Sequence, residues 1–369
     1  MKILIATGIY PPEIGGPATY SKFLKEALPL RGIEVSVLSY RTVKKAPKVF
    51  RHFWYFLKVI KQGRSVDVIY AQDPASVGLP ACLAARILCK KFIVKIVGDY
   101  AWEQGRQRYG VEDSLDDFVT QKKQYALQVR VMRWVQRHVA LSAYKIVVPS
   151  EYLKKIIALW GVDSKKIFIV YNAFEKVFVN KTREELRKKL EFVSPTILSV
   201  GRLVPWKGFN TLVEIMSEIR KYVSDARLVI VGDGTQKQEL QDKIREMEAE
   251  SYVTLVGAVS HKEVLDHIVA SDVFVLNTQY EGFSHLVLEV MSLGTPIITT
   301  SVGGNVEIVK NEENGILVPF NDKKEIVASI VLVFKEKGSA GKMAEKASED
   351  VLHYSTERML EGVIKVLTS

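Results

Sequence analysis

The sequence predicts an α/β protein built from two doubly wound domains, in each of which helices cover both faces of a parallel sheet. Short apolar runs alternate with longer helical patterns along the whole chain, which is typical of parallel sheets. The length of 369 residues suits two domains of ordinary size. A hydrophobic content of 47% indicates a folded chain, and no apolar run approaches the roughly 18 residues of a membrane-spanning helix.

The first domain is predicted over residues 1–175 and opens directly on an apolar strand at 2–7. Gly15 and Gly16 follow in the next loop, where backbone without side chains can approach a ligand at the start of a helix predicted at 18–31. The later strands are predicted at 34–39, 66–71, 91–97, 144–148 and 166–170, with helices at 76–89 and 151–160.

The N-terminus and the cysteines indicate a cytoplasmic protein. The chain enters its first strand without a signal-peptide pattern. Cys82 and Cys89 fall in one apolar helical pattern, about 10 Å apart, which is too far for a disulfide. We therefore expect two free, buried thiols, which fit a reducing compartment.

Basic residues are concentrated in the first half of the chain. Residues 1–180 carry 29 Lys and Arg against 14 Asp and Glu, whereas residues 181–369 carry 23 against 28. The segment 41–64 has no acidic residue and is predicted as a basic amphipathic helix with an aromatic face. The sequence leaves open whether this face contacts an anionic membrane or only packs on the sheet. Its cations are Arg41, Lys44, Lys45, Lys48, Arg51, Lys58, Lys61 and Arg64.

Two further predictions concern the middle of the first domain. The stretch 104–117 is irregular and charged, which favours a mobile loop. The stretch 118–140 is predicted as one long helix, and it carries a second group of cations that includes Lys122, Lys123, Arg130, Arg133 and Arg137.

The second domain, predicted over 176–354, presents two cations directly after its first strand at 196–200. Arg202 and Lys207 lie between Gly201 and Gly208, and together they can neutralise a diphosphate without a metal. No Asp-x-Asp pair suggests a divalent cation, so no metal is expected. Further strands are predicted at 227–231, 253–256, 273–276 and 297–300, and Gly232 follows the first of these.

The stretch 280–304 combines an anion site with two carboxylates. Glu281 and Gly282 occupy the turn after a strand, and Ser284 is a favourable N-cap for the helix that follows. The first-turn amides of this helix can bind a phosphate. Glu289 lies about 7 Å further along a helix that reads as apolar nearly all round, so it needs a polar partner. The amides belong to Phe283, Ser284, His285 and Leu286.

The motifs in the second half resemble those of a known enzyme family. EGFSHLVLE followed by GTPIITTSVGG resembles the paired-glutamate signature of retaining glycosyltransferases of family 4, and residues 201–208 match its G-R-x-x-x-x-K-G element. The resemblance implies the GT-B fold, in which two Rossmann-like domains face a central cleft. It also implies that the final helix at 355–369 packs back on the first domain.

The resemblance further implies roles for individual residues. Glu281 would contact the donor sugar, Glu289 would hold the ribose, and Arg202, Lys207 and the helix-end amides would bind the diphosphate. Gly15, Gly16, Gly201, Gly232 and Gly282 would allow close approach of the donor. Many relatives carry an acceptor-side histidine where this chain has Gly98, followed by Asp99, so Asp99 and Glu103 are both candidate replacements, and either could instead be structural.

The implied function is retaining, metal-independent transfer of a hexosyl group from a UDP- or GDP-sugar, without a cofactor. The acceptor is expected to be a lipid-linked or cell-surface glycan precursor, met at the inner face of an anionic membrane. Two alternatives remain: a nucleotide-sugar epimerase of the same fold, and a basic nucleic-acid-binding protein. The second is less favoured because no nucleic-acid-binding motif is present and the basic residues interleave with apolar helix faces.

Overall fold

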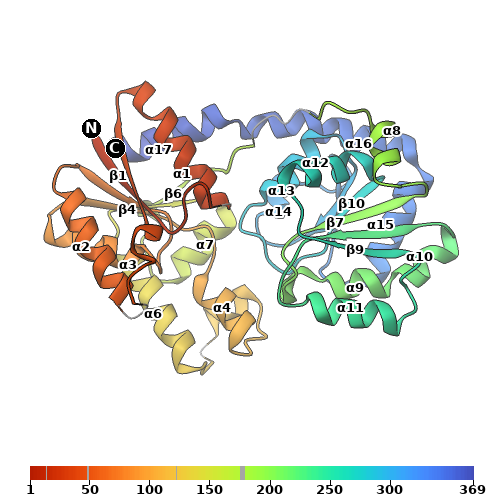
Figure 1. Cartoon of the computed structure of the whole chain (residues 1–369), viewed down its shortest axis with the longest axis horizontal. Coiled ribbons are helices and arrows are strands. Elements are labelled where there is room, and N and C mark those ends of the chain that lie inside the picture. The colour runs from red at the N-terminus through yellow and green to blue at the C-terminus, as the bar shows by residue number, and fades with distance from the viewer. Residues whose placement is uncertain (14, 48–49, 122, 175–178) are drawn as a thin grey trace. The chain divides into compact units, whose positions relative to one another are not determined.

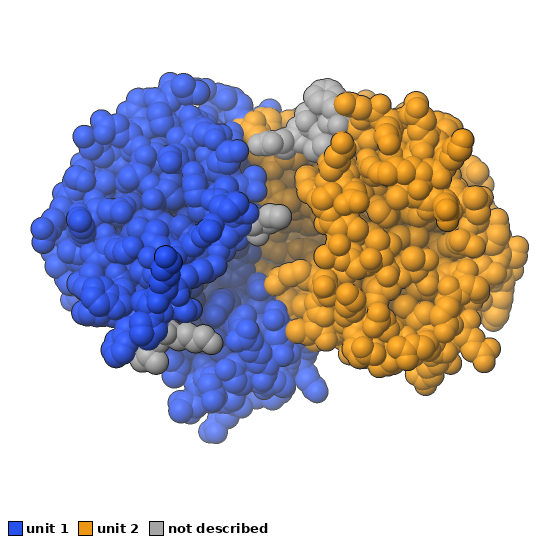
Figure 2. Space-filling view, in the orientation of Figure 1, with its two compact units in different colours: residues 1–171, 357–369 blue, residues 172–356 orange. Residues whose placement is uncertain are grey.

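The computed structural model describes residues 1–13, 15–47, 50–121, 123–174 and 179–369. Within them the chain forms two compact units, residues 1–171 with 357–369 and residues 172–356 (Figure 2). Each unit contains a parallel sheet of six strands with helices packed on it (Figure 1). The predicted fold class of two Rossmann-like, doubly wound domains is confirmed.

The sheet of the first unit has the strand order β2-β1-β3-β4-β5-β6. Its order reverses between β1 and β3, which is the point where open α/β sheets bind ligands. The final helix α17 belongs to this unit, where Lys145 donates to the carbonyl of Val366 at 2.9 Å. The strands are β1 Lys2–Thr7, β2 Glu34–Ser39, β3 Val68–Ala71, β4 Lys91–Lys95, β5 Lys145–Val148 and β6 Ile167–Ile169. The helices are α1 Gly16–Ala27, α2 Arg51–Gly63, α3 Gly78–Ile87, α4 Tyr100–Arg108, α5 Leu115–Thr120, α6 Leu127–Ser142, α7 Glu151–Leu159 and α17 Thr356–Thr368.

The sheet of the second unit has the order β12-β11-β10-β7-β8-β9, and its order reverses between β7 and β10. Both of these strands are buried at every residue, because helices cover both faces of the sheet. The strands are β7 Thr196–Val200, β8 Arg227–Val231, β9 Val253–Gly257, β10 Val273–Leu276, β11 Ile297–Thr300 and β12 Ile316–Val318. The helices are α8 Arg183–Lys189, α9 Phe209–Glu214, α10 Met216–Tyr222, α11 Lys237–Glu246, α12 His261–Ala270, α13 His285–Ser292, α14 Asn305–Ile308, α15 Lys323–Lys335 and α16 Lys337–Asp350.

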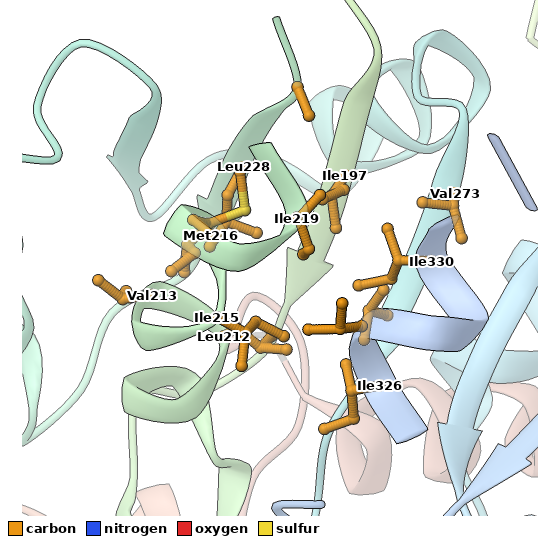
Figure 3. Close-up of a cluster of buried hydrophobic side chains, with 14 of the residues drawn as sticks. Ile197, Leu212, Val213, Ile215, Met216, Ile219, Leu228, Val273, Ile326 and Ile330 are labelled. Carbon is orange, nitrogen blue, oxygen red and sulfur yellow. The ribbon is translucent and has the colours of Figure 1, made fainter. Parts of the chain in front are cut away.

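Two apolar clusters hold β7 and β10 in place. On one face, Ile219 of α10 and Ile326 and Ile330 of α15 pack with Ile197 and Val273 of the two strands (Figure 3). On the other face, α13 buries Val287, Leu288, Val290 and Met291 against the sheet. The ends of β7 and β10 are therefore fixed by a close-packed core on both sides.

Three predicted elements of the first unit differ from the structure. The basic helix is shorter than the predicted 41–64, because residues Tyr40–Val43 form a 3₁₀ turn and α2 begins at Arg51. The stretch 104–117, predicted as a mobile loop, contains most of α4 and the start of α5. The predicted long helix 118–140 is two helices, α5 and α6. Lys48 and Lys122 lie outside the described residues.

The prediction of two buried thiols was wrong for Cys89. Both cysteines are free, and Cys82 is buried in α3. Cys89 is exposed because α3 ends at Ile87 and the residue adopts a left-handed conformation with φ of 51°. No described helix is long and apolar enough to cross a membrane.

A buried lysine at the end of β4 makes the stability of the first unit depend on pH. Lys95 is 4% exposed, and its ammonium lies 3.2 Å from the centroid of the Tyr20 ring. Burial lowers the pKa of Lys95 to about 7. The unfolded chain therefore binds more protons than the folded chain between pH 7 and the ordinary lysine pKa of about 10.4, so the free energy of unfolding rises with pH across this window.

Replacing Lys95 by methionine is expected to stabilise the protein most at and below pH 7, where the buried ammonium is charged in both states. The gain in melting temperature should shrink as pH rises towards 10, because the folded lysine is then neutral. Thermal unfolding at pH 6 and pH 10 measures the effect, and the exposed Lys91 of the same strand, replaced by methionine, is the control. Equal gains from Lys95→Met at the two pH values would contradict this assignment.

Candidate active site

The ends of β7 and β10 are joined by hydrogen bonds at the point where the strand order reverses. The 3₁₀ turn Pro205–Lys207 follows β7, and the carbonyl of its Trp206 accepts from the backbone N–H of Gln279 at 2.7 Å. The Asn277 side chain, directly after β10, donates to the carbonyl of Gly208 at 3.0 Å. These bonds fix the loop after β7 against the loop after β10, where the sequence predicts a phosphate site.

This arrangement brings together Lys207 and Glu281, two residues that lie far apart in the sequence. Their side chains form an ion pair, and they are 13% and 17% exposed respectively. Arg202, in the same loop as Lys207, is exposed. A cation and a carboxylate therefore lie at the carboxyl edge of the sheet, where an anionic ligand would compete with Glu281 for the lysine.

The turn that carries Glu281 is held by glycines from the loop after β11. Gly304 donates its N–H to the carbonyl of Glu281 at 2.8 Å. A β-carbon at Gly303 would overlap that carbonyl, and one at Gly304 would overlap the carbonyl of Gly282. Glycine is required here because the two loops approach each other closely.

Helix α13 begins next to this turn, as predicted. Ser284 is its N-cap, and the Ser284 hydroxyl accepts from the N–H of Val287 at 3.4 Å. The buried side chain of Asn172 donates to the carbonyl of Phe283 at 3.2 Å and holds the entry to the helix. His285 is exposed and Leu286 is half-buried. The first turn of α13 therefore lies beside Glu281.

Glu289 lies within α13 among buried apolar residues, and it has the polar partner that the prediction requires. Its side chain is 19% exposed, and Oε1 lies 2.9 Å from Nε2 of His261. His261 is the first residue of α12, and its side chain is 63% exposed. Burial raises the pKa of Glu289, although the nearby imidazole opposes that rise. The polar partner that the sequence requires is therefore His261, which no pattern in the sequence links to Glu289.

Glycines directly after β7 and β8 and at the end of β9 are joined by backbone hydrogen bonds. Gly232 donates to the carbonyl of Gly257 at 2.9 Å, and Gly201 donates to that of Val231 at 3.0 Å. A β-carbon on Gly232, whose φ is 150°, would overlap the carbonyl of Gly201. Glycine is therefore required at position 232, because the ends of β7 and β8 approach each other too closely for a side chain.

Two candidate residues of the first unit, Gly15 and Asp99, are N-caps of helices. Gly15 is the N-cap of α1 with φ of 150°, and a β-carbon there would lie 2.7 Å from Cδ1 of Ile9. No described atom lies within 4 Å of the corresponding position at Gly16. Asp99 is buried and caps α4, where it accepts from the N–H of Trp102 at 2.9 Å. Burial raises the pKa of Asp99, and hydrogen bonds from Gln136 and Trp102 oppose the rise. A catalytic role for Asp99 stays a prediction.

The described residues include no group of three or more His, Cys, Asp and Glu side chains placed to hold a metal ion. Lys207 and Glu281 form an ion pair at the junction of β7 and β10, Arg202 lies in the loop after β7, and Glu289 of α13 has His261 as its partner.

The fold and this junction define a GT-B protein of two Rossmann-like domains. A family model described as glycosyl transferases group 1 matches residues 182–350, and one described as glycosyltransferase family 4 matches residues 14–176. The chain belongs to the group 1 glycosyltransferases and is a glycosyltransferase.

Similar proteins span the whole chain or parts of it. An uncharacterized glycosyltransferase of Methanocaldococcus jannaschii is 26% identical over 99% of this chain and 97% of its own. A GDP-mannose-dependent alpha-(1-6)-phosphatidylinositol monomannoside mannosyltransferase of Mycobacterium tuberculosis is 30% identical over 45% of this chain and 46% of its own. The crystal structure of Anabaena HepE with UDP-glucose has a TM-score of 0.78 and 18% identity, covering 100% of this chain and 99% of that one.

Proposed function

We propose that this glycosyltransferase moves a hexosyl group from a UDP- or GDP-sugar to an acceptor hydroxyl, with retention of the anomeric configuration. The observation that carries the proposal is the Lys207–Glu281 pair at the switch point of the second sheet, beside the N-terminus of α13. A cation and helix-end amides suit a diphosphate, and a neighbouring carboxylate suits the hydroxyls of a sugar.

In this proposal each part of the donor has its own partner. Arg202, Lys207 and the first-turn amides of α13 bind the diphosphate, and Glu281 accepts from hydroxyls of the sugar. Glu289, oriented by His261, accepts from the ribose. The backbone of Gly232 and of its hydrogen-bonded neighbour Gly257 contacts the base. When the diphosphate binds Lys207, the ion pair between Lys207 and Glu281 breaks. The Glu281 carboxylate can then accept hydrogen bonds from the sugar.

The proposed chemistry depends on stabilising the leaving group. As the bond from the sugar to the diphosphate breaks, negative charge develops on the phosphate. The positive charges of Arg202 and Lys207 stabilise this negative charge. The acceptor hydroxyl attacks the same face of the sugar that the diphosphate leaves, and an oxygen of the departing phosphate takes the hydroxyl proton. The new bond therefore keeps the configuration of the donor.

We propose that no metal ion takes part. Turnover in EDTA is expected to stay within about twofold of turnover in Mg²⁺ or Mn²⁺, because two cationic side chains hold the diphosphate. Loss of turnover in EDTA that either metal restores would contradict metal independence.

The anomeric proton coupling in the product, measured by NMR, tests the reaction itself. A coupling that matches the donor supports retention, and the opposite coupling excludes it. Conversion of the nucleotide sugar without added acceptor would instead indicate an epimerase.

The proposed acceptor is a lipid-linked or cell-surface glycan precursor at the inner face of a membrane. The Mycobacterium tuberculosis relative is named for transfer to a phosphatidylinositol monomannoside, which is an amphiphilic acceptor. The basic first half of this chain also suits an acceptor in an anionic environment.

A further inference from the structure

Three helices of the first unit form one layer that has cations but no acidic residue. Helix α3 packs against both α2 and α6, and the three lie on the same side of the unit (Figure 1). The sequences of α2, α3 and α6 contain no Asp or Glu. Each contributes an exposed cation: Lys61, Arg86 and Arg130. Among the described residues, none of these three forms an ion pair.

The same layer exposes large apolar side chains. On α2, Phe53, Trp54 and Leu57 are between 39% and 56% exposed, although Tyr55 and Val59 of that helix are fully buried. The core therefore uses one face of α2 and leaves the aromatic face outside. Helices α3 and α6 also expose large apolar side chains, which are Leu83, Ile87, Leu127, Val131, Trp134 and Leu141.

A groove of about 340 Å³ lies between α2 and α3 within this layer. Its walls include Phe53 and Phe56 from α2 and Leu83 and Ile87 from α3. Apart from His52, every lining residue is apolar. A groove of this volume can hold part of a hydrocarbon chain, and its lining offers almost no hydrogen bond to a polar ligand.

We propose that α2, α3 and α6 together form the surface that lies on an anionic bilayer, with an acyl chain entering the groove between α2 and α3. Cations beside exposed aromatic residues match the boundary between headgroups and chains. The absence of acidic residues from all three helices removes repulsion from an anionic leaflet. The groove favours a bilayer over a nucleic acid, because its apolar walls carry a single polar side chain, His52, and so offer few partners to phosphates or to the polar edges of bases. This inference rests on the proposed function only in placing the acceptor at that bilayer.

The tryptophans provide a direct test, since all five lie among the described residues. Trp54 and Trp134 are 50% and 62% exposed and belong to the proposed surface, whereas Trp102, Trp160 and Trp206 are at most 2% exposed. On vesicles of phosphatidylglycerol and phosphatidylcholine at low salt, emission should shift to the blue, and quenching by acrylamide should fall several-fold. Trp54→Phe and Trp134→Phe should each remove part of the change.

Co-sedimentation with the same vesicles tests the charge. The triple variant Lys61→Gln, Arg86→Gln, Arg130→Gln is expected to lower the partition coefficient on the order of 100-fold, at about fivefold for each cation. A control triple variant with the same charge change, Lys324→Gln, Lys337→Gln, Lys342→Gln on α15 and α16, should bind within about twofold of wild type. High salt should release the wild type.

A double variant and a matched control test the apolar contribution to membrane binding. The double variant Phe53→Ser, Leu57→Ser should lower partitioning about tenfold or more. Val193→Ser, Leu352→Ser, which changes two exposed residues of the second unit, should leave it unaltered. Circular dichroism and nucleotide affinity of each variant show whether the fold and the donor site are intact.

Several results would overturn the inference. They are failure of the wild type to bind anionic vesicles at low salt, binding that leaves both exposed tryptophans open to acrylamide, and equal loss of binding in the control triple variant. Protection of the tryptophans by RNA or DNA but not by vesicles would assign the surface to a nucleic acid. Because these measurements use no sugar donor, they can fail while transfer to a short soluble acceptor persists, and the reverse also holds.

Discussion

Replacing Lys207 by alanine is expected to lower kcat/KM by roughly 10²–10³-fold. In the proposed site the half-buried ammonium of Lys207 lies where the diphosphate leaves, and removal of one such electrostatic partner typically has an effect of this size. The measurement is steady-state transfer from the donor sugar at saturating acceptor. Wild-type turnover by Lys207→Ala would contradict the role given to the residue.

Two further variants separate this role from stability. Lys207→Ala leaves the Glu281 carboxylate, which is 17% exposed, without its ion-pair partner. The melting temperature is therefore expected to fall by a few degrees. The double variant Lys207→Ala, Glu281→Gln should recover that stability but not the activity. Lys243→Ala breaks an ion pair with Glu214 in the same unit and should retain turnover.

Replacing Glu289 by glutamine is expected to weaken nucleoside diphosphate binding by roughly 10- to 100-fold. Loss of a charged acceptor for the ribose hydroxyls costs about 1.5–3 kcal/mol. The side chain keeps its shape and its position beside His261, so the fold should survive. Calorimetric titration measures the affinity, and Glu345→Gln on the exposed side of α16 is the control. Equal affinities of wild type and Glu289→Gln would rule out the ribose contact.

The wild-type affinity should also depend on pH in a way that the variant does not. Burial raises the pKa of Glu289, so its carboxylate takes up a proton at a higher pH than an exposed glutamate does. Nucleotide affinity should therefore fall as pH is lowered through that raised pKa, and Glu289→Gln should abolish this part of the pH dependence.

Much of the fold could be predicted from the sequence because its strands are short, continuous apolar runs. β1, β7, β10 and β11 coincide with the predicted ranges, since strands buried on both faces leave a clear apolar signal. The helices of the basic region were harder to predict. The sequence does not mark where α2 begins, and a capping serine, Ser114, starts α5 within a stretch that reads as an irregular loop.

The candidate site was predictable where a motif spans a strand end and a helix start. Glu281 and Ser284 lie in the turn and at the N-cap as expected. The pairing of Lys207 with Glu281 depends on the adjacency of β7 and β10, which follows from sheet order and not from sequence spacing. His261 was missed because nothing near it in the sequence links the start of α12 to α13.

Calorimetric titration of UDP- and GDP-sugars in EDTA tests the central claim most directly. We expect at least one of these sugars to bind the wild type with one-to-one stoichiometry, and Lys207→Ala to weaken this binding at least tenfold. If no nucleoside diphosphate sugar binds, if binding requires a divalent metal, or if Lys207→Ala binds as tightly as the wild type, the proposed donor site is contradicted.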